Sequence, residues 1–395
     1  MAKQTVRDID WAGKRALVRV DFNVPFERGT SRISDDMRIR EALPTINHLR
    51  NAGASVVLCT HLGRPGGRLD ADLQLGPVAK RLSELLSTPV EYVHDAPGVD
   101  AHRMASALNQ GDVLLLENVR FWPEEELNDD TFASSLAGLA DVYVNDAFGT
   151  AHRAHASTEG VARHLPAVAG LLMEKEVSFL GQVLNDPHRP LAALLGGAKV
   201  SDKLKILERL MGHADAIFVG GGMAATFLKA KGLSIGDSLL EEEMVEFCGD
   251  VIRRCAADGP PLYLPEDVVI AQQLEAGVES KTVPASSIPA GWIVLDIGEE
   301  TASDYAKKLG GMGTVVWNGP MGVFEVPPFH IGTRLVAEGL AMGSAVSVIG
   351  GGSTSEAVAQ LGLADEMTHV STGGGASLEF LEGKELPGVA ALDDK

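Results

Sequence analysis

The sequence predicts an α/β protein made of two doubly wound parallel-sheet (Rossmann-like) domains joined by a hinge helix. Short aliphatic or β-branched runs alternate with helical patterns along the whole chain. Nearly continuous apolar strands that alternate with helices are typical of parallel sheets covered on both faces. The length of 395 residues agrees with two domains of about 100–200 residues each.

The first half holds four candidate strands and three candidate helices. The strands are RALVRV (15–20), ASVVLCT (54–60), DVLLLEN (112–118) and DVYVND (141–146), and the helical stretches are 36–50, 75–87 and 130–139. A further helical stretch, from about 171 to 183, is the expected hinge helix. It places an N-terminal domain at 1–170 and a C-terminal domain at 171–375.

The second half holds six further candidate strands. They are PLAALLG (190–196), DAIFVGG (215–221), WIVLDIG (292–298), TVVWNG (314–319), AVSVIGG (345–351) and MTHVSTG (367–373), with helical patterns at 201–211, 222–231 and 353–361. We expect these runs to form the second parallel sheet.

The composition limits the partners. With 34 basic and 54 acidic residues the formal net charge is −20, which disfavours nucleic acid and anionic membrane surfaces. Cys59, Cys248 and Cys255 form no CxxC pair, and no signal peptide or membrane span is visible, so a reduced, cytoplasmic location is expected. The acidic runs 124–126 and 241–243 are expected on solvated surface.

The basic residues are divided unevenly between the halves. Residues 1–170 hold 15 Arg and 3 Lys, whereas residues 171–395 hold 5 Arg and 11 Lys. Arg grips carboxylates and phosphates with two hydrogen bonds, so an anionic ligand on the first half is indicated. A bias of the genome towards Arg is the alternative, although it does not explain the Lys-rich second half.

Polar side chains follow each candidate strand of the first half, where ligands bind in parallel sheets. They are Arg19, Asp21, Asn23, His61, Arg64, Asn118, Arg120, Asp146, His152, Arg153 and His155. Their convergence predicts a cationic cup for a small anion. Asp21 could act as a base, bind a substrate hydroxyl or orient an Arg. The histidines of H-x-x-H could instead cap a turn, and a metal site there is weakly indicated because no third ligand is obvious.

Four glycine-rich loops follow strands of the second half, at 196–199, 220–223, 350–354 and 373–376. Such loops let backbone N–H groups approach phosphates at helix N-termini. Lys199 and Lys203 are four residues apart and could share a helix face. No Walker loop, protein-kinase signature or dinucleotide fingerprint is present. The residues therefore predict an enzyme with an anionic substrate on one domain and a nucleotide on the other, suited to phosphoryl transfer.

Nine segments in chain order resemble the phosphoglycerate kinase family. They are RVDFNVP (19–25), HLGRP (61–65), LLENVRF (115–121), VNDAFGTAHRAH (144–155), LMEKEV (172–177), GGAKVSDK (196–203), VGGGMA (219–224), VWNGPMGVFE (316–325) and STGGGASLEFLEGKELPGV (371–389). The resemblance implies a glycolytic and gluconeogenic enzyme that reversibly transfers a phosphoryl group between ATP and 3-phosphoglycerate, giving ADP and 1,3-bisphosphoglycerate. It also implies a hinge-bending monomer whose tail, about 376–395, packs on the N-terminal domain.

The resemblance also implies site residues. For 3-phosphoglycerate they are Asp21, Phe22, Asn23, Arg38, His61, Leu62, Gly63, Arg64, Arg120 and Arg153. For the nucleotide they are Lys199, Lys203, Gly220, Gly221, Gly222, Gly319, Pro320, Glu325, Gly351, Gly352, Ser353 and Thr354. Arg38, Lys199 and the helix N-termini at Gly352 and Gly374 are expected to neutralise the transferring group.

Ser353 departs from the family pattern, which usually has an Asp that helps to hold Mg²⁺ at this position. A neutral hydroxyl is a weak Mg²⁺ ligand but a good helix cap. We expect Mg²⁺ to arrive with the nucleotide near Ser353 and assign no certain metal ligand. The alternative function is a catalytically weakened protein that binds phosphoglycerate and nucleotide.

Overall fold

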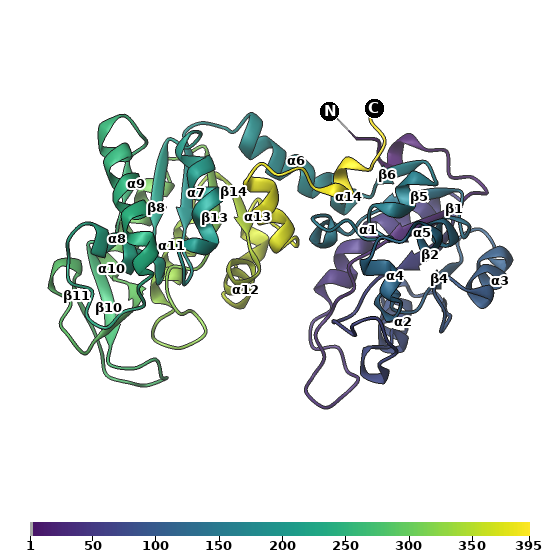
Figure 1. Ribbon diagram of the computed structural model, residues 1–395, viewed down its shortest axis with the longest axis horizontal. Coiled ribbons are helices and arrows are strands. Elements are labelled where there is room, and N and C mark those ends of the chain that lie inside the picture. Colours follow the sequence, from purple (N-terminus) through teal and green to yellow (C-terminus); the bar gives the residue numbers. More distant parts are fainter. Residues whose placement is uncertain (1–2) are drawn as a thin grey trace. The chain divides into compact units, whose positions relative to one another are not determined.

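The computed structural model describes residues 3–395, which fold into two compact units (Figure 1). Unit 1 takes in the chain up to Ser178 together with Glu385–Lys395, and unit 2 is Phe179–Lys384. Helix α6 (Leu171–Asn185) carries the chain from unit 1 into unit 2. The predicted hinge helix therefore corresponds to a continuous helix of 15 residues.

Unit 1 is built on a six-stranded parallel sheet with the order β3-β4-β2-β1-β5-β6. Its strands are β1 (Arg15–Arg19), β2 (Ser55–Cys59), β3 (Val90–Tyr92), β4 (Val113–Leu115), β5 (Val142–Asn145) and β6 (Ala167–Ala169). The inner strand β2 is buried along its whole length, as its unbroken apolar run predicts. The two edge strands, β3 and β6, were not predicted; each has only three residues, and neither lies in a long apolar run like that of β4.

Helices pack around this sheet and close the core of unit 1. They are α1 (Met37–Asn51), α2 (Gly76–Leu86), α3 (Val99–Ala107), α4 (Pro123–Glu126) and α5 (Asp130–Ala137). The core joins residues such as Ile46 of α1 and Val78 of α2 to Val18 and Leu58 of the central strands. Both helices bury one side, which fits their amphipathic patterns.

The C-terminal segment completes unit 1. Helix α14 (Pro387–Ala390) lies near the N-terminal end of the chain (Figure 1). The backbone N–H of Asp393 donates to the Ala167 carbonyl at 2.9 Å, and Lys3 forms an antiparallel bridge with Asp394. The two ends of the chain are thus tied together beside β6.

Unit 2 contains a second six-stranded parallel sheet, with the order β15-β14-β13-β7-β8-β9. Its strands are β7 (Leu191–Leu195), β8 (Ala216–Val219), β9 (Leu262–Tyr263), β13 (Thr314–Asn318), β14 (Val346–Gly350) and β15 (His369–Val370). Its helices are α7 (Leu204–Met211), α8 (Met223–Ala230), α9 (Val245–Ala257), α10 (Glu299–Leu309), α11 (Ile331–Ala341), α12 (Gly352–Gln360) and α13 (Gly375–Leu381). The two-sheet α/β fold class is confirmed.

One strand was predicted for the wrong sheet. The run 292–298 forms β12 (Ile293–Ile297), which pairs antiparallel with β10 (Asp267–Ala271). With β11 (Ser280–Pro284) these strands make a separate three-stranded sheet. Val294 of β12 packs with Val268 of β10 and Leu228 of α8 in a hydrophobic cluster separate from that of the six-stranded sheet. The prediction failed because an apolar run reports burial on both faces and not the identity of the neighbouring strand.

Two other findings bear on class and location. Within residues 3–395, no helix combines the length and the apolar character needed to cross a membrane. All three cysteines are free; Cys59 and Cys248 are buried and Cys255 is partly buried.

Candidate active site

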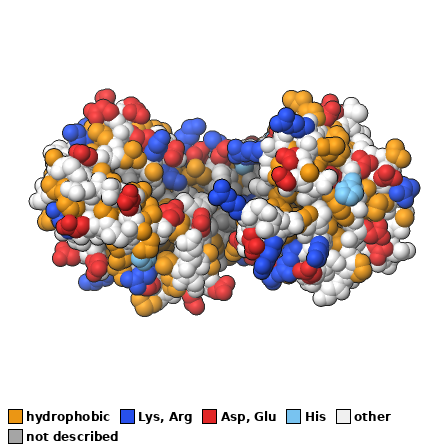
Figure 2. Space-filling model, turned by 90° about the horizontal axis from the view of Figure 1, so that it is seen from below, with side chains coloured by type: hydrophobic (Ala, Val, Ile, Leu, Met, Phe, Trp, Pro, Cys, Tyr) orange, Lys and Arg blue, Asp and Glu red, His pale blue; other side chains and the backbone are white. Residues whose placement is uncertain are grey.

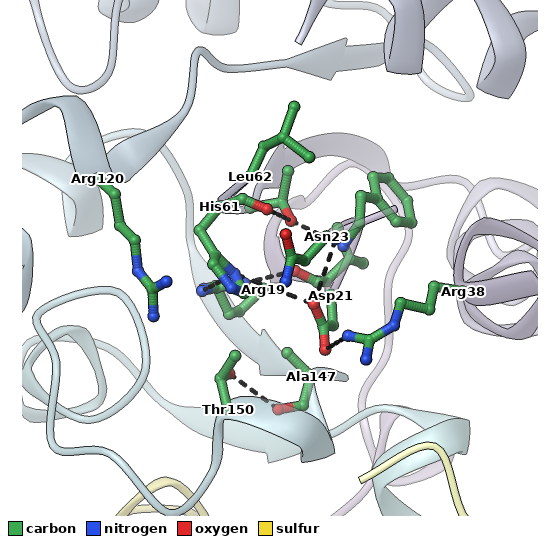
Figure 3. Close-up of polar contacts among 12 residues, drawn as sticks. Arg19, Asp21, Asn23, Arg38, His61, Leu62, Arg120, Ala147 and Thr150 are labelled. Carbon is green, nitrogen blue, oxygen red and sulfur yellow. Dashed lines mark hydrogen bonds and ion pairs between the residues drawn. The ribbon is translucent and has the colours of Figure 1, made fainter. Parts of the chain in front are cut away.

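Unit 1 gathers polar loops at one edge of its parallel sheet, beyond the carboxyl ends of β1, β2 and β5 (Figure 3). Asp21 follows β1 and is ion-paired with Arg38 near the start of α1. The imidazole of His61, after β2, has its Nδ1 4.0 Å from the Asp21 carboxylate. The Arg120 guanidinium extends from the opposite side of this group (Figure 3). We call this arrangement the cup.

Hydrogen bonds between backbone groups and side chains hold two of the predicted substrate-binding loops together. The Asn23 side chain accepts from the N–H of Gly63 at 2.9 Å, and the N–H of Phe22 donates to the Thr60 hydroxyl at 2.9 Å. Arg120 Nη1 donates to the Gly63 carbonyl at 3.0 Å. Phe22 and Leu62 are buried, so they support the cup and present backbone rather than side chain to it.

The cations of the cup are crowded. Arg120 is 3% exposed, and its Nη2 has no hydrogen-bond partner within residues 3–395. Burial, with the charges of Arg19 and Arg153, lowers the pKa of Arg120 to about 10. Arg153 is half-buried, whereas Arg64 is exposed and has no ion pair or hydrogen bond among the described residues. Arg120 Nε lies 3.2 Å from the Glu126 carboxylate, which compensates part of its charge. Its unpartnered Nη2, close to other cations, is a donor that a bound anion would stabilise.

Arg19 was predicted to face the anion, and this prediction is wrong. Its side chain is fully buried. Nε donates to the Ser157 hydroxyl at 2.8 Å, Nη1 donates to the Val20 carbonyl, and Nη2 lies 3.3 Å from His61 Nδ1. Its donors are therefore used inside the protein, beneath the cup.

The predicted solvated surface for the acidic runs is also wrong in part. Glu125 is fully buried and accepts from the N–H and hydroxyl of Ser157 at 2.8 and 2.6 Å. Glu241 is 8% exposed and accepts from the Ser201 hydroxyl and the Val200 N–H. Glu126 is exposed. In a run of charges, neighbouring side chains point in different directions, so one can face the core while the next stays in water.

The remaining polar residues after β5 have structural contacts. Asp146 is fully buried and accepts from the N–H groups of Leu172 and Met173, at 2.9 and 3.3 Å, at the start of α6. His155 Nδ1 lies 3.8 Å from Glu125, and burial lowers the pKa of His155 to about 4. Among the described residues, no group of three or more His, Cys, Asp or Glu could hold a metal ion.

Unit 2 carries its glycine-rich loops at the carboxyl edge of its parallel sheet. The loops follow β7, β8, β14 and β15, and Gly319 and Pro320 follow β13. Because all five strands are parallel, their loops meet at one edge of the sheet. The four glycine loops found in the sequence are thus brought to one side of one domain.

Two kinds of glycine occur in these loops. Glycines of the first kind are tightly packed. A Cβ on Gly196 would lie 2.3 Å from the Pro320 carbonyl oxygen, and a Cβ on Gly221 (φ +66°) would lie 2.6 Å from the Gly197 nitrogen. The N–H groups of Gly197 and Gly221 already donate to the carbonyls of Pro320 and Met321, at 2.9 and 2.8 Å. These glycines therefore let three loops pack backbone against backbone, and their N–H groups are not free for a ligand.

The other kind of glycine opens towards solvent. Gly352 begins α12 and Gly374 precedes α13, and a Cβ on either would meet nothing within 4 Å. Ser353 is exposed. Thr354 is buried, and its hydroxyl accepts from the Gly319 N–H at 2.7 Å. The loop at 350–354 is therefore accessible and anchored, as a phosphate loop at a helix N-terminus requires.

The lysines do not share a helix face, contrary to expectation. Lys199 is exposed in the loop after β7, and Lys203 ends a 3₁₀ turn, Ser201–Lys203, ahead of α7. The ammonium of Lys203 donates to Asn318 Oδ1, and burial lowers its pKa. Asn318 was missed by the sequence reasoning. Its buried Nδ2 has no hydrogen-bond partner in the described part of the chain, and its position as the last residue of β13 was the available signal.

The face of the molecule in Figure 2 shows acidic side chains spread widely and basic ones gathered in fewer places. That distribution matches a chain of net charge −20 with local cationic sites. One parallel-sheet unit with a cationic cup and another with open helix N-termini behind glycine loops are the features of a nucleotide-dependent phosphotransferase.

Comparison with known proteins identifies the family. A family model described as phosphoglycerate kinase matches residues 6–384. The chain is 57% identical over 395 residues to phosphoglycerate kinase of Pelotomaculum thermopropionicum and 55% identical over 399 residues to that of Chloroflexus aurantiacus, with the whole of each chain covered. The structure of phosphoglycerate kinase from Coxiella burnetii matches with a TM-score of 0.90 at 41% identity, covering 98% of both chains. The structure from Pyrococcus horikoshii OT3 gives 0.84 at 35% identity, again over 98% of both. The chain belongs to the phosphoglycerate kinase family.

This finding confirms the predicted function. The protein is a phosphotransferase of glycolysis that uses a carboxyl group as acceptor, and its substrates include a nucleotide. The alternative of a catalytically weakened binding protein is not supported, since relatives named phosphoglycerate kinase match the chain from end to end.

Proposed function

We propose that 3-phosphoglycerate binds in the cup of unit 1 and ATP or ADP binds on the glycine loops of unit 2. The observation that carries this proposal is the buried Arg120. Its Nε lies 3.2 Å from the exposed Glu126 carboxylate, but its Nη2 has no hydrogen-bond partner within residues 3–395 and the charges of Arg19 and Arg153 act on it. A buried cation with free donors is costly unless an anion completes it. The cup supplies both kinds of group that a phosphorylated carboxylic acid needs, namely guanidinium forks and neutral donors.

Within the cup we assign roles by chemistry. Arg120, Arg153 and the exposed Arg64 would contact the anionic groups of 3-phosphoglycerate, and Arg38 would reach the carboxylate that accepts the phosphoryl group. Asp21 holds Arg38 by an ion pair and would bind the substrate hydroxyl. Asn23 and the backbone of Phe22, Leu62 and Gly63 would shape the site through the hydrogen bonds that join their loops.

On unit 2 we assign the nucleotide phosphates to the open N-termini of α12 and α13. The N–H groups at Gly351, Gly352 and Gly374, with the N-terminal ends of the two helix dipoles, favour negative charge. The Asn318 amide, whose Nδ2 is unpartnered within residues 3–395, would add a donor. The packed loops at Gly220–Gly222 and Gly319–Pro320 would form a rigid wall for the base, and the exposed Glu325 would accept from the ribose hydroxyls.

Mg²⁺ fits this arrangement as a companion of the nucleotide. No cage of three or more acidic or histidine side chains exists among the described residues, and Mg²⁺ readily keeps water and substrate phosphates as ligands. The exposed Ser353 hydroxyl would be its nearest protein ligand. When bound, Mg²⁺ offsets phosphate charge.

The transfer step needs no covalent enzyme intermediate. A carboxylate oxygen of 3-phosphoglycerate attacks the γ-phosphorus of ATP, a new P–O bond forms as the bond to the β-phosphate breaks, and ADP leaves with the electron pair. Arg38, Lys199 and the helix N-termini at Gly352 and Gly374 would stabilise the charge of the transferring group. Since Lys199 is exposed and its chain position precedes the anchored Lys203, it would move with the phosphoryl group.

Further features belong to the proposal. Helix α6, which links the units, would act as the hinge, and the enzyme would work as a cytoplasmic monomer. The acidic net charge of −20 agrees with the absence of a role for nucleic acid or a membrane surface.

The test is ADP release from MgATP, with and without 3-phosphoglycerate, across a Mg²⁺ titration. We expect release that depends on 3-phosphoglycerate at an ordinary enzyme rate. Release that ignores 3-phosphoglycerate, or no release although both ligands bind, would contradict the assignment of the two sites.

A further inference from the structure

The neighbours of His61 determine which of its two ring nitrogens carries the proton. Its Nδ1 lies 3.3 Å from Arg19 Nη2 and 4.0 Å from Asp21 Oδ1, so only the first contact approaches a hydrogen bond. A guanidinium has donors alone and stays protonated in proteins. Nδ1 must therefore accept, and a neutral imidazole that accepts at Nδ1 carries its proton on Nε2.

The orientation of Arg19 is itself determined by a buried chain of hydrogen bonds. Arg19 Nε donates to the Ser157 hydroxyl at 2.8 Å, so this oxygen must donate its own proton elsewhere. It does so to Glu125 Oε1 at 2.6 Å, while the Ser157 N–H donates to Oε2 at 2.8 Å. Arg19, Ser157 and Glu125 are all fully buried and His61 is 4% exposed, so water cannot replace these partners.

We propose that Arg19, Ser157 and Glu125 are positioning residues that hold His61 as the neutral Nε2–H tautomer, so that His61 donates a hydrogen bond from Nε2 to 3-phosphoglycerate. Within residues 3–395 the imidazole makes no other side-chain hydrogen bond, which leaves this N–H for a ligand. The inference rests on the proposed binding of 3-phosphoglycerate in the cup.

The charges around the ring favour the same state. The charges of Arg19 on β1, Arg38 on α1, Arg120 and Arg153 act on His61, and Asp21 is its acidic neighbour. Burial first, then these guanidinium charges, hold the pKa of His61 well below its ordinary value. A neutral donor is thus present throughout the range near pH 7, and the binding of 3-phosphoglycerate does not follow an imidazole titration.

The direct test is ¹⁵N NMR of the enzyme with labelled histidine, in which the His61 signals are identified by their loss in His61→Gln. We expect a protonated Nε2 and an unprotonated Nδ1 from pH 6 to 8, with the Nε2 signal shifting when 3-phosphoglycerate is added. A protonated Nδ1, a titrating imidazolium in this range, or an Nε2 signal unmoved by saturating 3-phosphoglycerate would overturn the inference. The NMR experiment determines the tautomer without turnover. If only the substrate assignment is wrong, 3-phosphoglycerate will not bind in the cup, but the tautomer will still be the predicted one.

Kinetics of matched variants supply the second test. Ser157→Ala should mix the tautomers and raise the KM for 3-phosphoglycerate about tenfold to a hundredfold, the range for a hydrogen bond to a charged group, while the KM for MgATP stays within about twofold. Ser157→Thr keeps a hydroxyl and should restore most of the loss. Tyr143→Phe is the control, because the Tyr143 hydroxyl donates to the Ser157 carbonyl at 2.9 Å without touching the chain to His61. Equal effects of Ser157→Ala and Tyr143→Phe on tautomer and KM would contradict a positioning role.

Discussion

At the scale of single residues, the cup contains cations that keep a free donor and cations whose donors are used inside the protein. Arg19 and Arg120 are both almost completely buried, yet Arg19 uses its donors on Ser157 and His61 whereas Arg120 keeps Nη2 unpartnered in the described chain. The same residue type therefore has two tasks, and its hydrogen bonds distinguish them. Arg38 is of the first kind, because its side chain is 39% exposed and its ion-pair partner is Asp21.

Replacing Arg38 tests its proposed catalytic role. We expect Arg38→Ala to lower kcat by about a hundredfold to a thousandfold, as loss of a charge-stabilising donor does. The free energy of unfolding should fall by less than about 1 kcal/mol, since an ion pair with this exposure contributes little. Steady-state kinetics and urea unfolding of the same preparation measure both. A parallel loss of activity and stability would exclude a catalytic role.

Ser353 offers a second residue-scale prediction. We expect Ser353→Asp to lower the Mg²⁺ concentration that gives half-maximal ADP release, because a carboxylate binds Mg²⁺ better than a hydroxyl. Ser353→Asn is the matched control, since it has similar size without the charge. If the aspartate and asparagine variants have the same Mg²⁺ requirement as the parent, the ion is held by nucleotide and water alone.

At the scale of elements, the start of α6 depends on two side chains from elsewhere in unit 1. Asp146 accepts from the N–H groups of Leu172 and Met173, and the Thr45 hydroxyl accepts from that of Leu171 at 2.9 Å. Glycine at position 170 is required because a Cβ there would lie 2.1 Å from Asp146 Oδ1. The helix that links the units is thus capped by a buried carboxylate instead of by a local residue.

This cap predicts a pH dependence of stability. Burial raises the pKa of Asp146 from 3.8 to about 6, so the folded protein binds this proton more tightly than the unfolded chain. Its contribution to the free energy of unfolding therefore grows as pH falls from about 7 to about 4. Asp146→Asn removes this titration. The stability of the variant relative to the parent should therefore be about 2 kcal/mol more favourable at pH 7 than at pH 4.

Chemical unfolding of the parent and Asp146→Asn at several pH values checks this prediction. Comparing the two proteins cancels the effects of carboxylates with lowered pKa, such as Asp36, which act in the opposite direction. A stability difference that stays constant from pH 4 to 7 would show that Asp146 keeps an ordinary pKa.

At the scale of the whole molecule, the two units have separate hydrophobic clusters. One hydrophobic cluster of unit 1 joins β1 and β2 to α1 and α2, and a cluster of unit 2 joins β7 and β13 to α10 and α11. Helix α6 and the return of Glu385–Lys395 are the chain connections between the units. If each unit binds its own substrate, as we propose, each ligand should stabilise one unit.

Hydrogen exchange measured by mass spectrometry tests the assignment of substrates to units. At about 100 times Kd, a ligand stabilises the state that binds it by about 2.7 kcal/mol. We expect 3-phosphoglycerate alone to slow exchange in the cup loops of unit 1 and MgADP alone to slow it around α12 and α13. The reverse pattern, or protection of the same unit by both ligands, would refute the domain roles. Inorganic sulfate at the same ionic strength is the control for non-specific anion effects.

Part of the site was predictable because it follows from local pattern. Each parallel strand ends at the same edge of its sheet, so residues written directly after apolar runs, such as Asp21, His61 and Gly352, had to gather there. The site residues that the sequence did not reveal depend on contacts with residues far away in the chain. Glu125 belongs to an acidic run that was expected on solvated surface, and Asn318 belongs to a candidate strand, where nothing in the sequence marks it as a site residue. Only the fold buries the first among Ser157 and Arg19 and the second beside Lys203.

The sequence alone determined the fold class, the four glycine loops and the concentration of Arg around one site, because periodicity, glycine content and charge are local properties of the chain. The tertiary structure decided which strand pairs with which, as with β12 and its antiparallel partner β10, and which cation faces the ligand. Arg19 illustrates the reason: the hydroxyl that fixes its direction lies 138 residues away in the chain. Burial in three dimensions, which removes water as a competing partner, turns that distant contact into the one that orients His61.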